Sequence, residues 1–277
     1  MNRPQTIAGV VLTLNEEHNL PRALKSLSWC DELLVVDSGS RDRTHHVATI
    51  NGARFVENLQ TPPFQITEQR NWTLHSAGLS SDWVLFIDAD EEVRPPLAAT
   101  IRQLLYSTNP TDAYELAPRY WFLGKWLKHT QGFPNWHPRL VRRNSMSFEG
   151  GVWERFSDPS RVKRISEPYE HYAFSKGLDD WITTHLRYAE EEANQTIAIL
   201  STKKRDLPII RKKNLRILAA KLWLMRPFLR FFQKYILQLG FLEGWQSFLY
   251  CNLIFCYELF VVVKLIQHSR LKRGLSL

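Results

Sequence analysis

The sequence has 277 residues, of which 44% are hydrophobic and 23% charged; it is long enough to bury the core of one large domain and is unlike a disordered chain. Its three cysteines show neither a metal-ligand spacing nor a disulfide framework, which favours a reducing compartment, and nothing at the N-terminus resembles a signal peptide. Residues 203–277 contain 15 Lys and Arg against three acids, a balance of +12, which leaves −4 for residues 1–202.

The first half of the chain alternates short apolar strands with helices. Residues 7–14 and 33–36 are apolar, and each stretch runs into a polar turn. A helix with Pro21 in its first turn separates them, and a third strand at 53–56 and a helix over 66–77 follow. This order predicts a parallel sheet with right-handed crossovers. Ligands of such sheets bind at the carboxyl ends of the strands.

The next apolar stretch, residues 84–92, ends in four carboxylates within five residues. Asp88 and Asp90 share one side of an extended chain, where two carboxylates attract a divalent cation. An acidic helix N-terminus is the alternative for this stretch, and Glu91 and Glu92 are expected to start the following helix. The sequence has no glycine-rich nucleotide loop, so a bound nucleotide would need carboxylates for its base and ribose and a metal for its diphosphate.

Four motifs follow one another in this half: Thr-Leu-Asn-Glu-Glu (13–17), Val-Val-Asp-Ser-Gly-Ser-x-Asp-x-Thr (35–44), Gln-Arg-Asn (69–71) and Asp-Trp-Val-Leu-Phe-Ile-Asp-Ala-Asp-Glu-Glu (82–92). Together they closely resemble the family-2 glycosyltransferases of the GT-A fold. Within that family the chain looks most like the bacterial lipopolysaccharide-core β-1,4-glucosyltransferase group. The similarity continues through Arg139-Leu140, Val152-Trp153-Glu154, His171-Tyr172 and residues 235–244.

The resemblance implies an α/β fold of the GT-A type, Rossmann-like with a mostly parallel central sheet, and a C-terminal helical, membrane-associating extension. Residues 1–202 would form the catalytic domain, with a nucleotide-sugar-binding half at 1–112 and an acceptor half at 113–202. Residues 203–277 would form a basic amphipathic region that associates with a membrane.

The resemblance also implies a donor site. Thr13, Leu14 and Glu16 would lie against the nucleoside. Asp37 would hold the uracil ring, with Ser38 and Asp42 supporting its turn. A helix-capping Asx turn is compatible with those roles of Asp37 and Asp42.

The diphosphate and the metal would be bound by a second group of residues. Asp88 and Ala89 would lie at the ribose, and Arg70 would pair with diphosphate oxygens. Asp90 would bind Mn²⁺ or Mg²⁺ with Asp88 and His171 as further ligands. A surface helix arginine is the alternative for Arg70, and a buried hydrogen-bonding histidine is the alternative for His171.

The acceptor half is rich in aromatic residues, which suit sugar faces but equally suit a core. An inverting transfer needs one general base, and the resemblance favours Glu154, because related enzymes have Val-His-Glu where this chain has Val-Trp-Glu. Trp153 is thus a departure from the family pattern. Glu149 is the second candidate for the base, and an ordinary surface glutamate is the alternative.

The C-terminal region mixes cations with bulky apolar residues at helical spacing. This pattern favours a membrane interface over nucleic acid. The cations between residues 211 and 234 are Arg211, Lys212, Lys213, Arg216, Lys221, Arg226, Arg230 and Lys234. Residues 248–263 form the most apolar run but span too few residues to cross a bilayer, so an interfacial or re-entrant segment is expected, with a packed helical subdomain as the alternative.

The sequence therefore predicts a metal-dependent inverting glycosyltransferase. It would move a hexose, expected to be glucose, from a UDP-sugar to a lipid-linked or lipopolysaccharide-core oligosaccharide. It would act as a peripheral or monotopic protein at the cytoplasmic face of the bacterial inner membrane, without binding nucleic acid. The alternative is a catalytically silent sugar-nucleotide-binding or scaffold protein that retains the fold.

Overall fold

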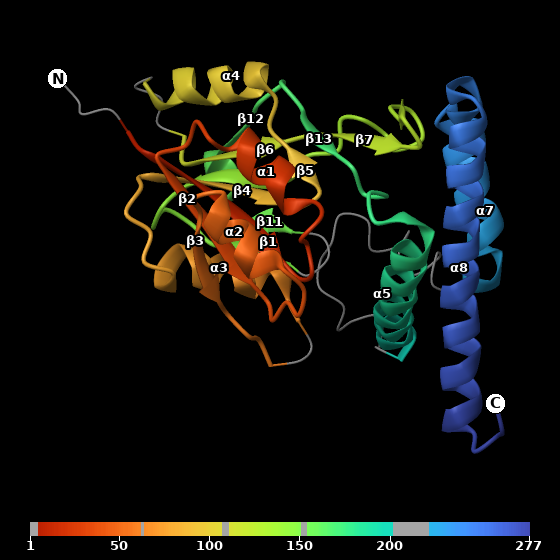
Figure 1. Cartoon of the computed structure of the whole chain (residues 1–277). Helices are drawn as coiled ribbons and strands as arrows, with labels where there is room; N and C mark the ends of the chain where they lie inside the picture. Colours follow the sequence, from red (N-terminus) through yellow and green to blue (C-terminus); the bar gives the residue numbers. More distant parts are fainter. Residues whose placement is uncertain (1–4, 62–63, 107–110, 151–153, 202–221) are drawn as a thin grey trace. The chain divides into compact units, whose positions relative to one another are not determined.

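A computed structural model describes residues 5–61, 64–106, 111–150, 154–201 and 222–277 (Figure 1). The chain divides into two compact units. The first contains residues 1–121 and 133–175, and the second contains residues 122–132 and 176–277. The long helix α5 (Gly177–Ser201) belongs to the second unit, together with the C-terminal helices. The functional division at residues 112 and 202 stays a prediction.

The first unit is built on a sheet of seven described strands in the order β12-β6-β9-β4-β1-β2-β3 (Figure 1). Its strands are β1 (Ile7–Thr13), β2 (Glu32–Asp37), β3 (Arg54–Glu57), β4 (Trp83–Asp88), β6 (Ala113–Leu116), β9 (His137–Arg142) and β12 (Val162–Arg164). Strands β1 to β4 pair in parallel, as do β6 and β12, while β9 runs antiparallel to both of its neighbours. The predicted α/β class of the GT-A type, with a mostly parallel sheet, is confirmed.

Helices cover both faces of this sheet, because successive strand side chains point to opposite faces and both sets are apolar. Leu24 and Ile101 pack with Val11 on one face, and Leu74 packs with Val10 on the other. Thus α1, α2 and α4 line the first face and α3 the second. The helices are α1 (Leu20–Ser26), α2 (Thr44–Ile50), α3 (Ile66–Ser76) and α4 (Pro95–Leu105).

A smaller sheet lies beyond the end of β4. In it β13 (Tyr169–His171) pairs antiparallel with β5 (Glu91–Glu92) and parallel with β7 (Pro118–Phe122). The expectation that Glu91 and Glu92 begin a helix is therefore wrong, since α4 starts at Pro95 and the two glutamates form β5. The remaining short elements of this unit are β10 (Phe148–Glu149), β11 (Arg155–Phe156) and the 3₁₀ turn η1 (Pro159–Arg161).

The second unit is helical. Both α5 (Gly177–Ser201) and α7 (Arg226–Phe232) pack against α8 (Trp245–Lys272) (Figure 1). Shorter elements complete it: β8 (Lys125–Trp126), η2 (Trp223–Met225), η3 (Gln233–Leu237) and η4 (Gly240–Glu243). With 28 residues, α8 is longer than its apolar run suggested, and among the described helices it alone could cross a membrane by length and composition.

Three cations predicted at a membrane interface point into this unit instead. Arg226 and Arg230 pair with the buried Glu258 at 2.8 and 3.1 Å. The ammonium of Lys234 donates to the carbonyl oxygen of Thr130 at 2.9 Å. These three residues are thus held by partners within the unit, and the association of residues 203–277 with a membrane stays a prediction. The others in that group, Arg211, Lys212, Lys213, Arg216 and Lys221, lie outside the described residues.

Candidate active site

Polar side chains gather where β1, β2 and β4 end. The parallel register places Thr13 opposite Asp37, and Leu12 opposite Asp88. Because these strands are neighbours, their carboxyl ends form one edge of the sheet, as predicted. Two hydrogen-bonded networks occupy this edge, one around Asp37 and one around Asp88.

Asp37 organises the turn after β2. Its Oδ1 accepts from the Thr13 hydroxyl at 2.7 Å and from the Ser40 hydroxyl at 2.5 Å. Its Oδ2 accepts from the backbone amides of Gly39 and Ser40 at 2.8 and 2.6 Å. The Ser38 hydroxyl accepts from Gln69 of α3 at 3.3 Å. Asp37 is buried, so a uracil ring would meet a turn that this carboxylate already holds rigid.

Asp42 joins this turn to the one after β1. Its Oδ2 accepts from the amide of Glu17, and its Oδ1 accepts from the amide and hydroxyl of Thr44. Burial raises the pKa of Asp42, but these hydrogen bonds outweigh burial and lower it. The amide of Glu16 donates in turn to the Thr44 hydroxyl at 2.9 Å. The side chain of Leu14, directly after β1, is 44% exposed.

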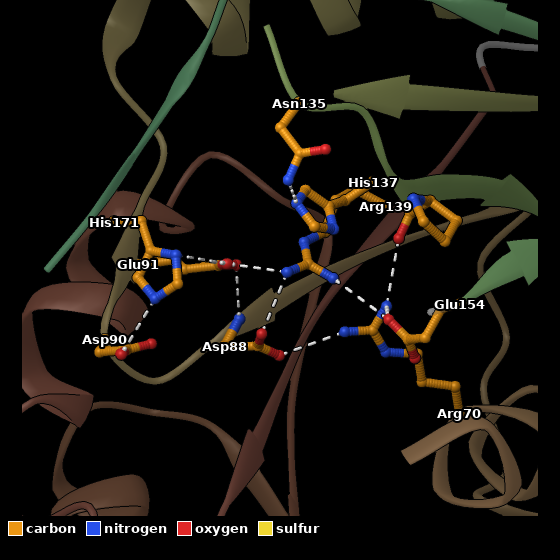
Figure 2. Close-up of polar contacts among 10 residues, drawn as sticks. Arg70, Asp88, Asp90, Glu91, Asn135, His137, Arg139, Glu154 and His171 are labelled. Carbon is orange, nitrogen blue, oxygen red and sulfur yellow. Dashed lines mark hydrogen bonds and ion pairs between the residues drawn. The ribbon is translucent and has the colours of Figure 1, made fainter. Parts of the chain in front are cut away.

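Asp88 lies between two arginines (Figure 2). Its Oδ1 is 3.2 Å from Arg70 Nη2, and its Oδ2 is 3.0 Å from Arg139 Nη2. Burial disfavours the charged form of Asp88, but Arg139 and Arg70 lower its pKa to about 2. Ala89 is buried in the apolar core, so only its main chain could meet a ribose.

Arg70 is a buried residue, and the alternative of a surface helix arginine is wrong. Besides Asp88, its guanidinium contacts the Pro138 carbonyl oxygen at 3.1 Å and Glu154 Oε2 at 2.9 Å. The pairing with diphosphate oxygens stays a prediction. The Nε of Arg70 has no hydrogen-bond partner among the described residues, so the guanidinium keeps donor capacity besides these contacts.

Arg139 connects the residues of the second network, yet the resemblance includes it only within Arg139-Leu140, and no role was predicted for it. Its Nη2 also contacts Glu91 Oε1 at 2.8 Å, while Glu91 Oε2 accepts from the Asp88 amide at 2.9 Å. Its Nη1 lies 3.9 Å from Glu154 Oε2. The position of Arg139 in the buried middle of β9 explains this role, because a cation buried in a sheet needs carboxylate partners.

Asp90 and His171 face each other (Figure 2). Asp90 Oδ2 is 3.2 Å from His171 Nε2, and His171 Nδ1 is 3.8 Å from Glu91 Oε1. Burial lowers the pKa of His171, but Asp90, followed by Glu91, raises it to about 9. In an octahedral Mg²⁺ site with bonds near 2.1 Å, adjacent donor atoms are roughly 3 Å apart. The Asp90 and His171 atoms thus fit two neighbouring positions around such an ion.

Asp88 does not join this pair, because both of its oxygens face arginines. Among the described residues, no three His, Cys, Asp or Glu side chains form a group arranged to hold a metal ion. The structure therefore supplies two of the three expected ligands together. Asp88 as a ligand stays a prediction that requires its side chain to turn.

Glu154 lies at the far side of the second network, with 9% of its side chain exposed. One oxygen, Oε2, pairs with Arg70, and the buried Oε1 has no hydrogen-bond partner among the described residues. Burial raises the pKa of Glu154, although Arg70 and Arg139 lower it. Glu149 is instead an exposed residue paired with Arg155 at 3.2 Å. Trp153 lies outside the described residues.

The family model for glycosyl transferase family 2 matches residues 10–146. This segment contains all four motifs, both turns and most of the Asp88 network. Residues 10–146 belong to glycosyl transferase family 2. Glu154 and His171, from the following residues of the same unit, complete the network of this family-2 domain.

Individual relatives agree with this assignment. Lipopolysaccharide core biosynthesis glycosyltransferase LpsC of Rhizobium meliloti is 26% identical over 145 residues, covering 52% of this chain and 53% of LpsC. An uncharacterized glycosyltransferase of Rickettsia felis is 23% identical over 283 residues, covering 97% of this chain and 92% of that protein. The chain spans 20%, 34% and 53% of the length of three of the curated relatives that it matches.

A solved structure was also similar to the chain. Glucosyl-3-phosphoglycerate synthase from Mycobacterium tuberculosis, in complex with Mn²⁺ and UDP-glucose, is 31% identical over 42% of this chain and 44% of that chain, with a TM-score of 0.35.

Proposed function

We propose that this protein is a metal-dependent inverting glycosyltransferase, which moves a hexose from a UDP-sugar to a lipid-linked or lipopolysaccharide-core oligosaccharide. The family-2 domain supports the reaction class. The observation that carries the mechanism is that two features occur in one network. Asp90 and His171 form a candidate cation site, and the carboxylate of Glu154 has one buried oxygen without a hydrogen-bond partner among the described residues.

The donor would bind across the two networks. The turns held by Asp37 and Asp42 offer a rigid edge for a nucleoside, with Leu14 exposed directly after β1. Asp90 and His171 would hold the divalent ion. When bound, such an ion neutralises the charge that develops on a departing diphosphate. Arg70 and Asp88 lie beside this pair, where a guanidinium and a carboxylate suit phosphate oxygens and ribose hydroxyls respectively.

Glu154 would act as the general base. Its Oε1 would accept the proton of the acceptor hydroxyl. At the same time the hydroxyl oxygen would bond to the anomeric carbon, and the bond between that carbon and the nucleoside diphosphate would break. Arg70 would keep Oε2 in place during this step, because the contact uses the other oxygen. The raised pKa of Glu154 makes it a stronger base than an exposed glutamate.

The acceptor and the location are inferred from a relative and from the C-terminal region. LpsC supports a lipopolysaccharide-core acceptor through its name alone. The +12 balance of residues 203–277 and the length of α8 support association with the inner membrane, on its cytoplasmic face, where UDP-sugars are the expected donors.

Replacing Asp90 with Ala tests the metal site. The ion would lose one of two adjacent ligands, so transfer from radiolabelled UDP-glucose to deacylated core acceptor should fall about 10²- to 10³-fold, and EDTA should have the same effect on the wild type. Mn²⁺ binding, followed by electron paramagnetic resonance in the presence of UDP, should weaken in parallel. The exposed Glu68→Ala is the matched control and should change neither quantity.

Two outcomes would contradict the proposal. Full activity of Asp90→Ala would reject the metal assignment. Absence of metal-dependent transfer from every common UDP-sugar, with UDP binding retained, would instead favour a catalytically silent sugar-nucleotide-binding protein. The arginines that occupy both oxygens of Asp88 are the observation that favours this second candidate.

A further inference from the structure

The turn between α7 and α8 exposes bulky apolar side chains. We call this the apolar tip: Leu237, Leu239, Phe241, Leu242 and Trp245. Leu237 is 66% exposed, Leu242 63% and Trp245 60%. Phe228 and Phe232 of α7 and Phe248 of α8 are also exposed. Contiguous exposed apolar surface of this kind marks an interaction site.

The charges of the same hairpin point the opposite way. Glu258, the acid at the centre of α8, is buried and pairs with Arg226 and Arg230 of α7. Glu243 is also buried, where it accepts from the amides of His129 and Thr130 at 2.7 and 2.9 Å. The hairpin thus buries two of its acids together with an apolar core that includes Ile254, Val261 and Leu265, while its largest leucines and aromatic side chains stay exposed. Burial of charge beside exposed bulky apolar side chains suits a lipid surface better than water.

The apolar tip is held firmly in its exposed position. The ring of Tyr235 contacts those of Phe241 and Phe248, with centroids 6.4 and 5.6 Å apart. Gly240 is packed so closely that an added Cβ would lie 2.7 Å from the carbonyl oxygen of Lys234. Leu239 has a φ of 60°, a left-handed conformation that a leucine adopts only under constraint. The tip is thus a preformed surface.

The ion pairs of Glu258 also bear on whether α8 crosses a membrane. Glu258 lies 13 residues beyond Trp245, which is about 20 Å along a helix. If α8 crossed a bilayer, the carboxylate of Glu258 would lie in the hydrocarbon. Its two arginines would then have to enter the hydrocarbon with it, or the ion pairs would have to break. The continuous helical run of η2, α7 and η3, residues 223–237, supplies both arginines, and its 15 described residues fall short of the roughly 20 needed to cross with α8.

We propose that the apolar tip inserts shallowly into an anionic lipid bilayer, and that both ends of α8 stay on one side of the membrane. A lipid surface fits better than a protein partner, because the side chains of the tip present no charged group. Residues 203–277 also contain 12 Lys and Arg besides the three held inside the unit, against one acid besides the two that are buried, and this excess favours an anionic surface. This proposal rests on the proposed function, because insertion of the tip would serve to bring the catalytic unit to a lipid-linked acceptor.

Flotation of the full-length protein with vesicles of phosphatidylethanolamine and phosphatidylglycerol tests the surface. The double variant Leu242→Asp/Trp245→Asp should lower the bound fraction at least about tenfold. An acid at the start of α8 suits a helix N-terminus, so folding should be preserved, as circular dichroism would verify. The matched control is Ile50→Asp, on the 66% exposed Ile50 of the first unit, which should bind as the wild type does. Equal binding of the double variant would overturn the proposal.

Labelling tests the topology. Ser276→Cys and Glu68→Cys would each be placed in a chain without its native cysteines and treated with a membrane-impermeant maleimide. Both sites should react in everted inner-membrane vesicles and be protected in spheroplasts. Reaction of the Ser276 site only in spheroplasts would show that α8 crosses, and would overturn the proposal.

The transfer reaction separates this proposal from the proposed function. Leu242→Asp/Trp245→Asp should retain full transfer to a soluble deacylated acceptor, because it touches none of the site residues, and should lose transfer to acceptor embedded in vesicles. A protein that binds vesicles through the tip but transfers no sugar would contradict the proposed function alone.

Discussion

Replacing Glu154 with Gln should lower the turnover of sugar transfer by about 10²- to 10⁴-fold, the contribution typical of a general base. An amide has the size of the carboxylate, and its oxygen can still accept from Arg70 at the position of Oε2. It cannot take the proton of the acceptor hydroxyl. The KM for the UDP-sugar should change little, since Glu154 is placed at the acceptor side of the reaction. Initial rates at saturating donor would measure the effect.

Glu149→Gln is the control for this experiment, because Glu149 is the other candidate and the structure pairs it with Arg155 at the surface. It should retain turnover within about twofold, as expected of an exposed pair. Burial raises the pKa of Glu154, so the acidic limb of the rate profile should lie above the range of an ordinary glutamate in the wild type. Loss of turnover in Glu149→Gln and not in Glu154→Gln would reverse the assignment.

The donor edge of the sheet could be predicted from the sequence because it depends on local patterns. Apolar strands that run directly into Thr13, Asp37 and Asp88 define where each strand ends, and parallel topology then brings those ends together. The turn chemistry is equally local, since Asp37 and Asp42 bond mainly to residues two or three positions away. Local sequence patterns are therefore sufficient to predict where these strands end and which turns follow them.

Most members of the second network could be named from the family resemblance, but their contacts could not be predicted, because these join distant residues. Arg139 meets Asp88 and Glu91 from about fifty residues away, and a strand pattern gives no sign of which carboxylate a buried arginine will find. Glu91 followed by acids and prolines resembles a helix start, but its pairing with His171 of β13 makes it a strand. Arg226 and Arg230 have the spacing of surface cations, yet both form ion pairs with the buried Glu258, about thirty residues further along the chain.

Arg139 is also where the largest effect on stability is expected. Its guanidinium contacts Asp88, Glu91 and Glu154, and its carbon Cζ lies 5.4 Å from the centroid of the Tyr169 ring. Arg139→Met would fill most of the volume of the arginine side chain. It would leave the buried Glu91 with His171, whose Nδ1 is 3.8 Å from Oε1, as its remaining ion-pair partner among the described residues. Breaking a buried pair by removing one partner typically costs 3–5 kcal/mol. We expect a loss of about that size in the free energy of unfolding, measured by urea denaturation.

Two further variants show whether this loss comes from the stranded carboxylate. Arg164→Met removes a strand arginine that is 60% exposed and paired with Glu115, and it should cost less than about 1 kcal/mol. Glu91→Gln added to Arg139→Met removes the uncompensated charge, so the double variant should be more stable than Arg139→Met alone, with a coupling energy of about 1–3 kcal/mol. If Arg139→Met and Arg164→Met cost the same, Arg139 would not hold the network together, and the placement of Asp88 beside the metal pair would need another cause.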